Sequence, residues 1–408
     1  AGEELMDKKN IKGFIFNVAY NLIATAVPLA ILQIFLLPLV SRYISDEAYG
    51  LAVTIIALLN ICPGVLGMAI NNVRLLNDKG ISDNPHRYNF PRILREICLL
   101  NVFVMLIITI IYEGTFNLSV VLTVFLSVLW LLREYLIVEY QIKLSYRNIL
   151  INNVLLSVGY LIGFVFFYFS HYWQFIYITG YLIALFDLYK KGFIFTEPFV
   201  RTKLLNTYRK DTFFLSFSAV LTRITTYADR LILYPVLGGR QVSIYYAASI
   251  MAKLISMIIS PITSVFLAYL SKIKKKPKKA FNIAFALSIV LCIVGYFLII
   301  WSSNFVLSIL YPEYVQEAVV LVPYTALSTI LYVLITILNP LILKFFDMKW
   351  QVFINGINVI LYLVISFICL NMGGIKMFCI GTAIVNFVKL ITMLILYYGG
   401  KTKAEFTE

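Results

Sequence analysis

The sequence predicts an all-α membrane protein with about twelve transmembrane helices in two six-helix lobes. The first observation is composition: the 408 residues are 61% hydrophobic and 13% charged, against roughly 45–50% and 25% in soluble proteins. The second is a series of apolar runs, each long enough to cross a hydrocarbon core of ~30 Å. The third is that Lys and Arg collect in alternate polar breaks. Together these observations exclude a soluble fold.

Polar or turn-forming breaks set the limits of the expected helices. The first apolar run is long and lacks a small-residue cleavage site, so we interpret it as a retained helix and not as a signal peptide. Ala1 to Leu5 precede Met6 and are interpreted as a cloning remnant. Pro28 and Pro38 predict kinks in the first helix. The expected helices are 13–42, 48–72, 92–112, 117–139, 147–170, 173–189, 212–237, 242–271, 280–302, 315–344, 350–371 and 374–398.

The longest break divides the chain into two halves of six helices. It covers 190–211 and contains Pro198 and six Lys or Arg, which predicts a cytoplasmic linker. The N-lobe is expected at 13–189 and the C-lobe at 212–398, with 1–12 and 399–408 as cytoplasmic tails. Residues 44–52 align without a gap on 237–245, the first connection of each half. Each half has an even number of helices, so the repeats are parallel.

The distribution of cations predicts the orientation. With the N-terminus inside, 27 Lys and Arg fall in inner segments and only Arg42, Arg240 and Lys376 in outer turns. The positive-inside rule therefore places both termini in the cytoplasm. Arg74 and Arg133 count here as inner-loop cations. The basic residues form no single patch, so the net charge of +14 does not indicate a nucleic-acid partner.

Four cations fall within the predicted spans: Arg223, Arg230, Lys253 and Lys389. A cation at the centre of a membrane costs at least ~2.5–3.5 kcal/mol and normally faces a watery cavity or an ionic partner. Several of them in one chain favour an anionic ligand, and a guanidinium group suits phosphate because its planar fork donates two parallel hydrogen bonds. The alternative for Arg230 is a structural pair with Asp229 or Glu134, and for Lys389 snorkelling or pairing.

Polar residues recur at helical spacing in three of the expected spans. The seventh helix carries Arg223, Thr226, Tyr227 and Arg230 on one face, with the two guanidinium groups about 10 Å apart along the axis. For the stripes in the first helix, hydrogen bonding between helices is an equally compatible interpretation. The residues expected to line a cavity are Asn17, Asn21, Thr25, Thr226, Tyr227, Tyr246 and Ser249.

Catalytic and cofactor-binding patterns are not found in the sequence. His86 and His171 fall in different loops, and the five cysteines form no CxxC pair, so neither a metal site nor a His-based triad is expected. A glycine-rich nucleotide loop is absent as well. We therefore expect no enzyme and no bound cofactor. Asp229, beside Thr222, Thr225 and Thr226, is the candidate for coupling to Na⁺ or H⁺.

Three stretches of the chain resemble the polysaccharide-transporter, or O-antigen flippase, family. They are SRYISDEAYGLAVTIIALLN at 41–60, YRNILINNVLLSVGYLIG at 146–163 and YADRLILYPVLGGRQVSIYYAASIMAKL at 227–254. The order, length and topology of the helices extend the resemblance over nearly the whole chain. It is a resemblance to members of the multidrug/oligosaccharidyl-lipid/polysaccharide exporter superfamily.

The resemblance implies a MATE-like pair of six-helix lobes around a cationic cavity. It implies a flippase that moves undecaprenyl-diphosphate-linked oligosaccharide from the cytoplasmic to the outer leaflet by alternating access, for O-antigen or capsule synthesis. Arg223, Arg230 and Lys253, with Lys389, would bind the diphosphate. The expected partners are the lipid-linked oligosaccharide, membrane lipids and the polysaccharide polymerase machinery, and the expected location is the bacterial inner membrane.

Two other functions remain open on the sequence. An ion-coupled antiporter for drugs or cations would need an acidic cavity, whereas the charges within these spans are mostly positive. A membrane-embedded polysaccharide polymerase or glycosyltransferase would need acidic groups or a large loop at the outer face, and the outer connections are short. The sugar, the coupling ion and the oligomeric state have no signal in the sequence.

Overall fold

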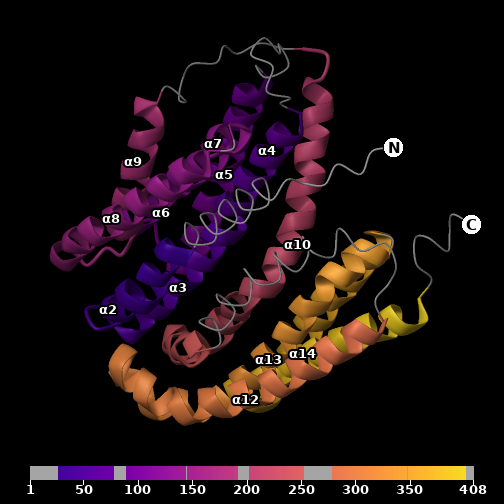
Figure 1. Cartoon of the computed structure of the whole chain (residues 1–408). Helices are drawn as coiled ribbons and strands as arrows, with labels where there is room; N and C mark the ends of the chain where they lie inside the picture. Colours follow the sequence, from indigo (N-terminus) through magenta and orange to yellow (C-terminus); the bar gives the residue numbers. More distant parts are fainter. Residues whose placement is uncertain are drawn as a thin grey trace, which may run out of the picture. The chain divides into compact units, whose positions relative to one another are not determined.

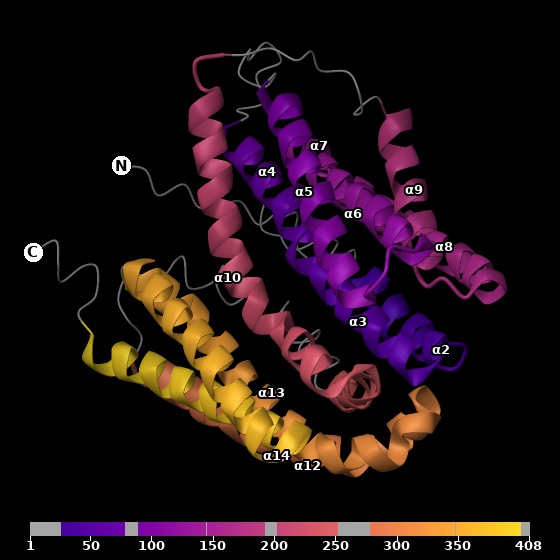
Figure 2. The same cartoon turned by 180° about the vertical axis from the view of Figure 1, so that it is seen from behind.

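The computed structural model describes residues 26–77, 89–143, 145–191, 202–251, 278–346 and 348–400. Regular secondary structure in these ranges is helical throughout, with no strand, which confirms the all-α prediction (Figures 1 and 2). Asn17, Asn21, Thr25 and Lys253 lie outside the described residues, as does most of the expected helix 242–271 beyond Met251.

Prolines interrupt the first two predicted spans. The π-helix η1 (Ile31–Leu36) leads into α2 (Leu37–Ser41), which has Pro38 in its first turn. Proline has no N–H to donate, so the regular i→i−4 ladder cannot pass through it. The expected helix 48–72 is likewise two helices, α3 (Asp46–Ile61) and α4 (Pro63–Asn77), divided at Cys62 in front of Pro63.

Four of the next five helices agree closely with the expected spans, whereas the short helix over 138–142 was not expected as a separate element. Gly114, with φ 74°, ends one of them in the left-handed conformation that favours glycine. Asn117 caps the following helix by accepting a hydrogen bond from the N–H of Val120. They are α5 (Phe90–Glu113), α6 (Leu118–Leu136), α7 (Val138–Ile142), α8 (Tyr146–Ser170) and α9 (Gln174–Lys190).

Among the remaining helices, those that begin at 205, 278 and 348 are longer than expected. Gly373 and Gly374 interrupt α14, and Gly374 has φ 64° and ψ −151°, a region open essentially to glycine alone. This kink separates the two spans predicted at 350–371 and 374–398. The elements are α10 (Leu205–Leu237), a helix over 239–251, α12 (Lys278–Leu310), η3 (Pro312–Tyr314), α13 (Val315–Phe345) and α14 (Met348–Gly399).

Seven helical segments in the described part of the chain are long and apolar enough to cross a membrane. Their outer surfaces are apolar: on α12, Trp301 is 84% exposed and Phe305 71%. Side chains of this kind are compatible with a hydrocarbon solvent and would be a liability in water. The fold is therefore that of a multi-pass membrane protein.

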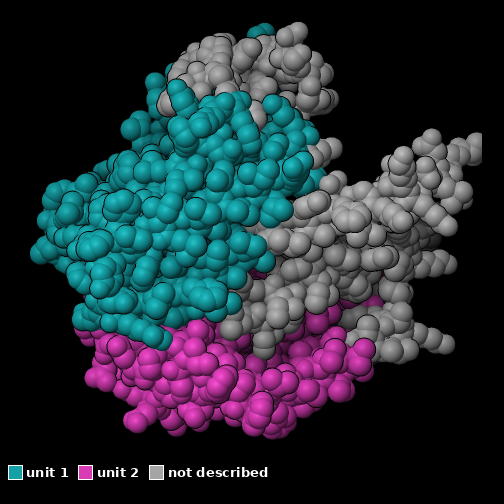
Figure 3. Space-filling model, turned by 60° about the vertical axis from the view of Figure 1, so that its left-hand side comes forward, with its two compact units in different colours: residues 1–45, 54–223 teal, residues 46–53, 224–408 magenta. Residues whose placement is uncertain are grey.

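The chain divides into two compact units (Figure 3). Unit 1 comprises 1–45 and 54–223, and unit 2 comprises 46–53 and 224–408. The division falls inside α10, eleven residues after the start of the expected C-lobe at 212, and the first eight residues of α3 belong to unit 2.

Each unit has its own close packing. In unit 1, a Cβ on Gly159 of α8 would lie 2.6 Å from the Cα of Gly180 on α9, so small residues let these helices approach closely. In unit 2, Ala228 of α10 packs against Tyr362 and Val385 of α14. This contact fixes which face of α10 points at α14.

Candidate functional site

The polar face of α10 carries four of the candidate ligand-binding residues that the structure describes, namely Arg223, Thr226, Tyr227 and Arg230. Arg223 is partly exposed and makes no hydrogen bond or ion pair with another described residue. Thr226 is exposed and Tyr227 is partly buried. Arg223 is thus a cation in an apolar helix, and no described residue acts as its counter-ion. This is what we expect of a residue that binds an anionic ligand.

Arg230, one of two predicted diphosphate residues on this helix, is 4% exposed and enclosed by aromatic rings. Its guanidinium carbon lies 4.6 Å from the ring centroid of Tyr246 and 5.7 Å from that of Tyr227. Its Nη1 donates to the Val53 carbonyl at 3.4 Å, and its Nε has no hydrogen-bond partner among the described residues. Cation–π contacts therefore replace a carboxylate partner for this charge.

The structural pairs considered for Arg230 are not present in the described residues. Asp229 accepts a hydrogen bond from the Arg230 backbone N–H at 2.9 Å, but no ion pair links their side chains. Glu134 lies in unit 1 and pairs with Arg133 at 3.3 Å. Arg230 is thus a buried cation that forms no ion pair with a described residue, although the Asp229 carboxylate lies within electrostatic range.

Asp229, the candidate coupling residue, is 8% exposed. It lies within electrostatic range of Tyr245, Tyr362 and Cys379, and no described cation forms an ion pair with it. A buried carboxylate without a partner is costly, so such groups generally bind a cation or a proton. The guanidinium of Arg230 also lies within electrostatic range of Asp229, and the coupling role of Asp229 stays a prediction.

A tyrosine cluster stands next to Arg230 in unit 2 and is formed by Tyr49, Tyr246, Tyr311 and Tyr314. Tyr246 is 2% exposed, so in this structure it packs within the cluster. Its ring meets that of Tyr49 edge-on at 6.0 Å, and the hydroxyls of Tyr49 and Tyr311 are 3.0 Å apart. Sequence analysis missed three of the four members because α3, residues 239–251, and the segment around η3 are far apart in the chain.

Hydrogen bonds and an ion pair from the first turn of α3 hold this cluster in place. Glu47 accepts a hydrogen bond from the Gly239 N–H at 2.6 Å, and Asp46 accepts one from the Tyr314 hydroxyl at 2.9 Å. Arg240 lies 3.7 Å from Asp46 and donates to Glu317 at 2.8 Å. Ser249 is buried and donates to the Tyr246 carbonyl at 2.9 Å.

Lys389 has surroundings of its own. Its Nζ donates to Asn355 Oδ1 at 3.0 Å, and both residues belong to α14. Lys389 and Arg230 share no hydrogen-bond partner among the described residues, so a common diphosphate site for the two stays a prediction.

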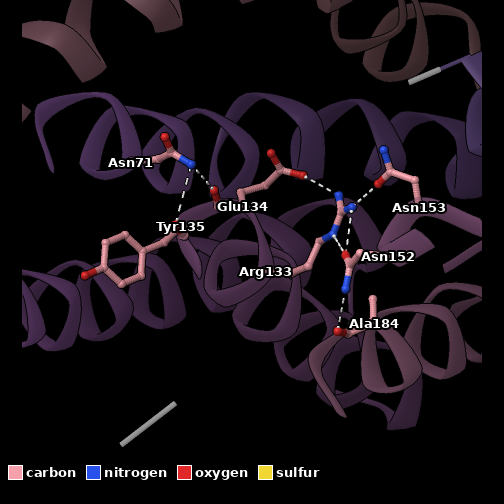
Figure 4. Close-up of polar contacts among 7 residues, drawn as sticks. All are labelled: Asn71, Arg133, Glu134, Tyr135, Asn152, Asn153 and Ala184. Carbon is pink, nitrogen blue, oxygen red and sulfur yellow. Dashed lines mark hydrogen bonds and ion pairs between the residues drawn. The ribbon is translucent and has the colours of Figure 1, made fainter. Parts of the chain in front are cut away.

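Unit 1 contains a buried polar network around Arg133, which the sequence analysis counted among the inner-loop cations. Arg133 is 8% exposed, and its guanidinium donates to the side chains of Asn152 and Asn153 and pairs with Glu134 (Figure 4). Asn152 in turn donates to the Ala184 carbonyl at 2.8 Å. Counting Arg133 as an inner-loop anchor was wrong, because it sits in the last turn of α6 with its charge directed into the helix bundle.

Arg74 requires the same correction. It is 1% exposed at the end of α4, where it forms an ion pair with Glu139 and donates to the Tyr135 hydroxyl at 2.5 Å. Both arginines have polar partners for most of their donors. They are structural members of unit 1, in contrast to Arg223 and Arg230.

Solved structures with the same fold are membrane transporters. No protein-family model and no curated protein sequence matches the chain. A multidrug-resistance MATE family transporter of the MOP superfamily, in an inward-facing conformation, is similar with a TM-score of 0.60 and 13% identity over 92% of this chain and 97% of that one. A second MATE structure, in complex with MaD3S, gives 0.61 and 12%, over 93% of each chain.

The lipid II flippase MurJ, in an inward closed conformation, is similar as well. Its TM-score is 0.68 with 15% identity, over 94% of this chain and 86% of that one. Similarity at this level of identity establishes the fold alone. The chain has the all-helical fold shared by MATE transporters and MurJ.

Proposed function

We propose that this protein is a flippase for a lipid-linked oligosaccharide with a diphosphate bridge, moved from the cytoplasmic to the outer leaflet by alternating access. The observation that carries the proposal is the pair of cations on α10. Neither Arg223 nor Arg230 forms an ion pair with a described carboxylate, and guanidinium groups match the oxygens of a diphosphate. The fold shared with MATE transporters and MurJ supports transport as the activity.

The wider setting is part of the same proposal. The positive-inside distribution supports a bacterial inner membrane location with cytoplasmic termini. The flipped oligosaccharide would then be the substrate of polysaccharide polymerase machinery at the outer face, for O-antigen or capsule. Lys253 would add a further cation to the diphosphate site.

Asp229 supports coupling of the transport to Na⁺ or H⁺. Its carboxylate is buried and forms no ion pair with a described residue, although the guanidinium of Arg230 lies within electrostatic range, so a bound cation or proton would offset part of the cost of burial. The same residue favours a second candidate function, a drug or cation antiporter. That candidate predicts binding of cationic dyes that lipid-linked sugar does not affect.

The test is flipping of a fluorescent short-chain prenyl-diphosphate-linked oligosaccharide in proteoliposomes, with and without Na⁺ and pH gradients. Arg223→Ala should reduce flipping by at least about tenfold, the value expected for one lost charge-assisted hydrogen bond. Lys376→Ala, which removes an exposed cation of α14, is the matched control and should leave flipping unchanged. Absence of flipping by the wild type under every gradient would contradict the proposal.

A further inference from the structure

A small cavity lies between the two halves of α14, beside Lys389. Its volume is about 60 Å³, and Lys389, Asn358 and Thr392 line it together with four apolar side chains. A water molecule occupies roughly 10–15 Å³ on this measure, so the cavity has room for a few non-hydrogen atoms. It accommodates one functional group with an adjoining hydroxyl and is too small for a whole sugar ring.

The polar residues that line the cavity are one cation, Lys389, and two neutral residues, Asn358 and Thr392. Lys389 uses one of its three ammonium donors on Asn355 and forms no ion pair with a described carboxylate. Asn358 is 5% exposed, and its Oδ1 has no hydrogen-bond partner among the described residues. The Thr392 hydroxyl donates to the Val388 carbonyl at 2.8 Å, which leaves its oxygen free to accept.

This combination distinguishes between classes of anion. A diphosphate carries at least two negative charges and offers almost only acceptors, whereas the cavity has a single described cation and acceptors of its own. A carboxylate has one charge for Lys389, and a hydroxyl beside it donates to the Thr392 oxygen or to Asn358. An acidic sugar carries this carboxylate and hydroxyl side by side.

The depth of Lys389 excludes a resident lipid headgroup as the source of the anion. Ten residues separate it from Gly399 and fourteen from Ile375, which correspond to about 15 Å and 21 Å along the helix. A lipid phosphate stays at the surface of a hydrocarbon core that is ~30 Å thick. An anion that reaches Lys389 therefore belongs to a transported molecule.

We propose that the cavity at Lys389 binds the carboxylate of an acidic sugar in the lipid-linked substrate, at a site separate from the diphosphate site on α10. The proposal rests on the flippase function and specifies its substrate class. It assigns Lys389 to selecting the saccharide and removes it from the set of diphosphate ligands.

The experiment measures binding of three probes to the full-length protein in nanodiscs. The probes are a short-chain prenyl diphosphate, the same lipid carrying a glucose disaccharide, and the same lipid carrying a disaccharide that ends in glucuronic acid. The variants are Lys389→Gln and Thr392→Val, with Lys376→Gln as the control for a lost positive charge on the same helix. Melting temperatures verify folding.

The wild type should bind the acidic probe about tenfold more tightly than the neutral one, the value of one charge-assisted hydrogen bond. Lys389→Gln should abolish that preference and leave the affinity for the sugar-free lipid unchanged, and Thr392→Val should reduce the preference. Equal weakening of all three probes by Lys389→Gln would overturn the proposal in favour of a phosphate site. Absence of an acid preference in the wild type would overturn it while the flippase function stands, and binding of no probe would overturn both.

Discussion

Arg230 and Arg133 are both buried arginines, yet their partners differ. The guanidinium of Arg133 contacts two asparagines and a glutamate, whereas that of Arg230 contacts two tyrosine rings and one carbonyl oxygen. Burial of a charge is costly unless it is paired and hydrogen-bonded. We therefore interpret Arg133 as a residue kept for structure and Arg230 as one kept for function.

This difference predicts opposite effects of the same substitution. Arg230→Met removes, at similar volume, a buried charge that forms no ion pair with a described residue, so the melting temperature should stay equal or rise, while flipping falls by about tenfold or more. Arg133→Met leaves Asn152, Asn153 and Glu134 without their donor and should lower the melting temperature. Thermal unfolding in detergent, with proteoliposome flipping in parallel, measures both effects. A clear fall in the stability of Arg230→Met would show that its charge is structural.

The sequence could indicate these residues but not their environments. Arginine within an apolar span identified Arg230, and this signal depends on residue type alone. Arg74 and Arg133 were misread because they stand in the last turns of their helices, where a loop cation and a buried ion pair look alike in sequence. The partner of Arg74, Glu139, is 65 residues away in the sequence. The positive-inside rule counts cations by their position and cannot predict such a contact.

The start of α3 is held against residues 239–251 at two glycines. A Cβ on Gly50 would overlap the backbone of Gly239, and a Cβ on Gly239 would overlap that of Glu47. Glycine at both positions lets the backbones approach, so Glu47 reaches the Gly239 N–H and the tyrosine cluster forms above them. The gap-free alignment of 44–52 on 237–245 identified both segments as equivalent connections, but it carried no information that they touch.

Gly50→Ala should therefore destabilise unit 2. The added methyl group forces the two segments apart, at a cost of about 1–3 kcal/mol for overpacking a close contact. Gly356→Ala is the matched control: nothing lies within 4 Å of a Cβ there, and alanine is favoured over glycine in a helix by about 1 kcal/mol. The melting temperature should fall for Gly50→Ala and stay equal or rise for Gly356→Ala. Equal behaviour of both variants would contradict the close approach.

Hydropathy predicts the fold class and the limits of the helices better than it predicts the contacts between them. The helical class and the limits of most spans follow from apolar runs and from breaks at Gly and Pro, as at Gly114 and Gly374. The compact units do not follow from these signals, because a contact boundary lies inside the uninterrupted helix α10. The charged linker at 190–211 predicts a break between two groups of helices. The unit to which a helix belongs depends on its packing contacts, which the sequence pattern does not contain.

The orientation of the whole chain in the membrane can be tested by cysteine labelling. Four of the five cysteines lie within apolar helices, Cys62 lies between α3 and α4, and none is exposed, so they can be replaced to leave a background without thiols. Single cysteines at the exposed positions Arg240 and Lys376 should then react with a membrane-impermeant maleimide in intact cells. Those at Lys190 and Lys210 should react only after permeabilisation, because the positive-inside distribution places them in the cytoplasm. Labelling of Lys210→Cys from outside would reverse the topology, and with it the direction in which α10 presents Arg223 to the substrate.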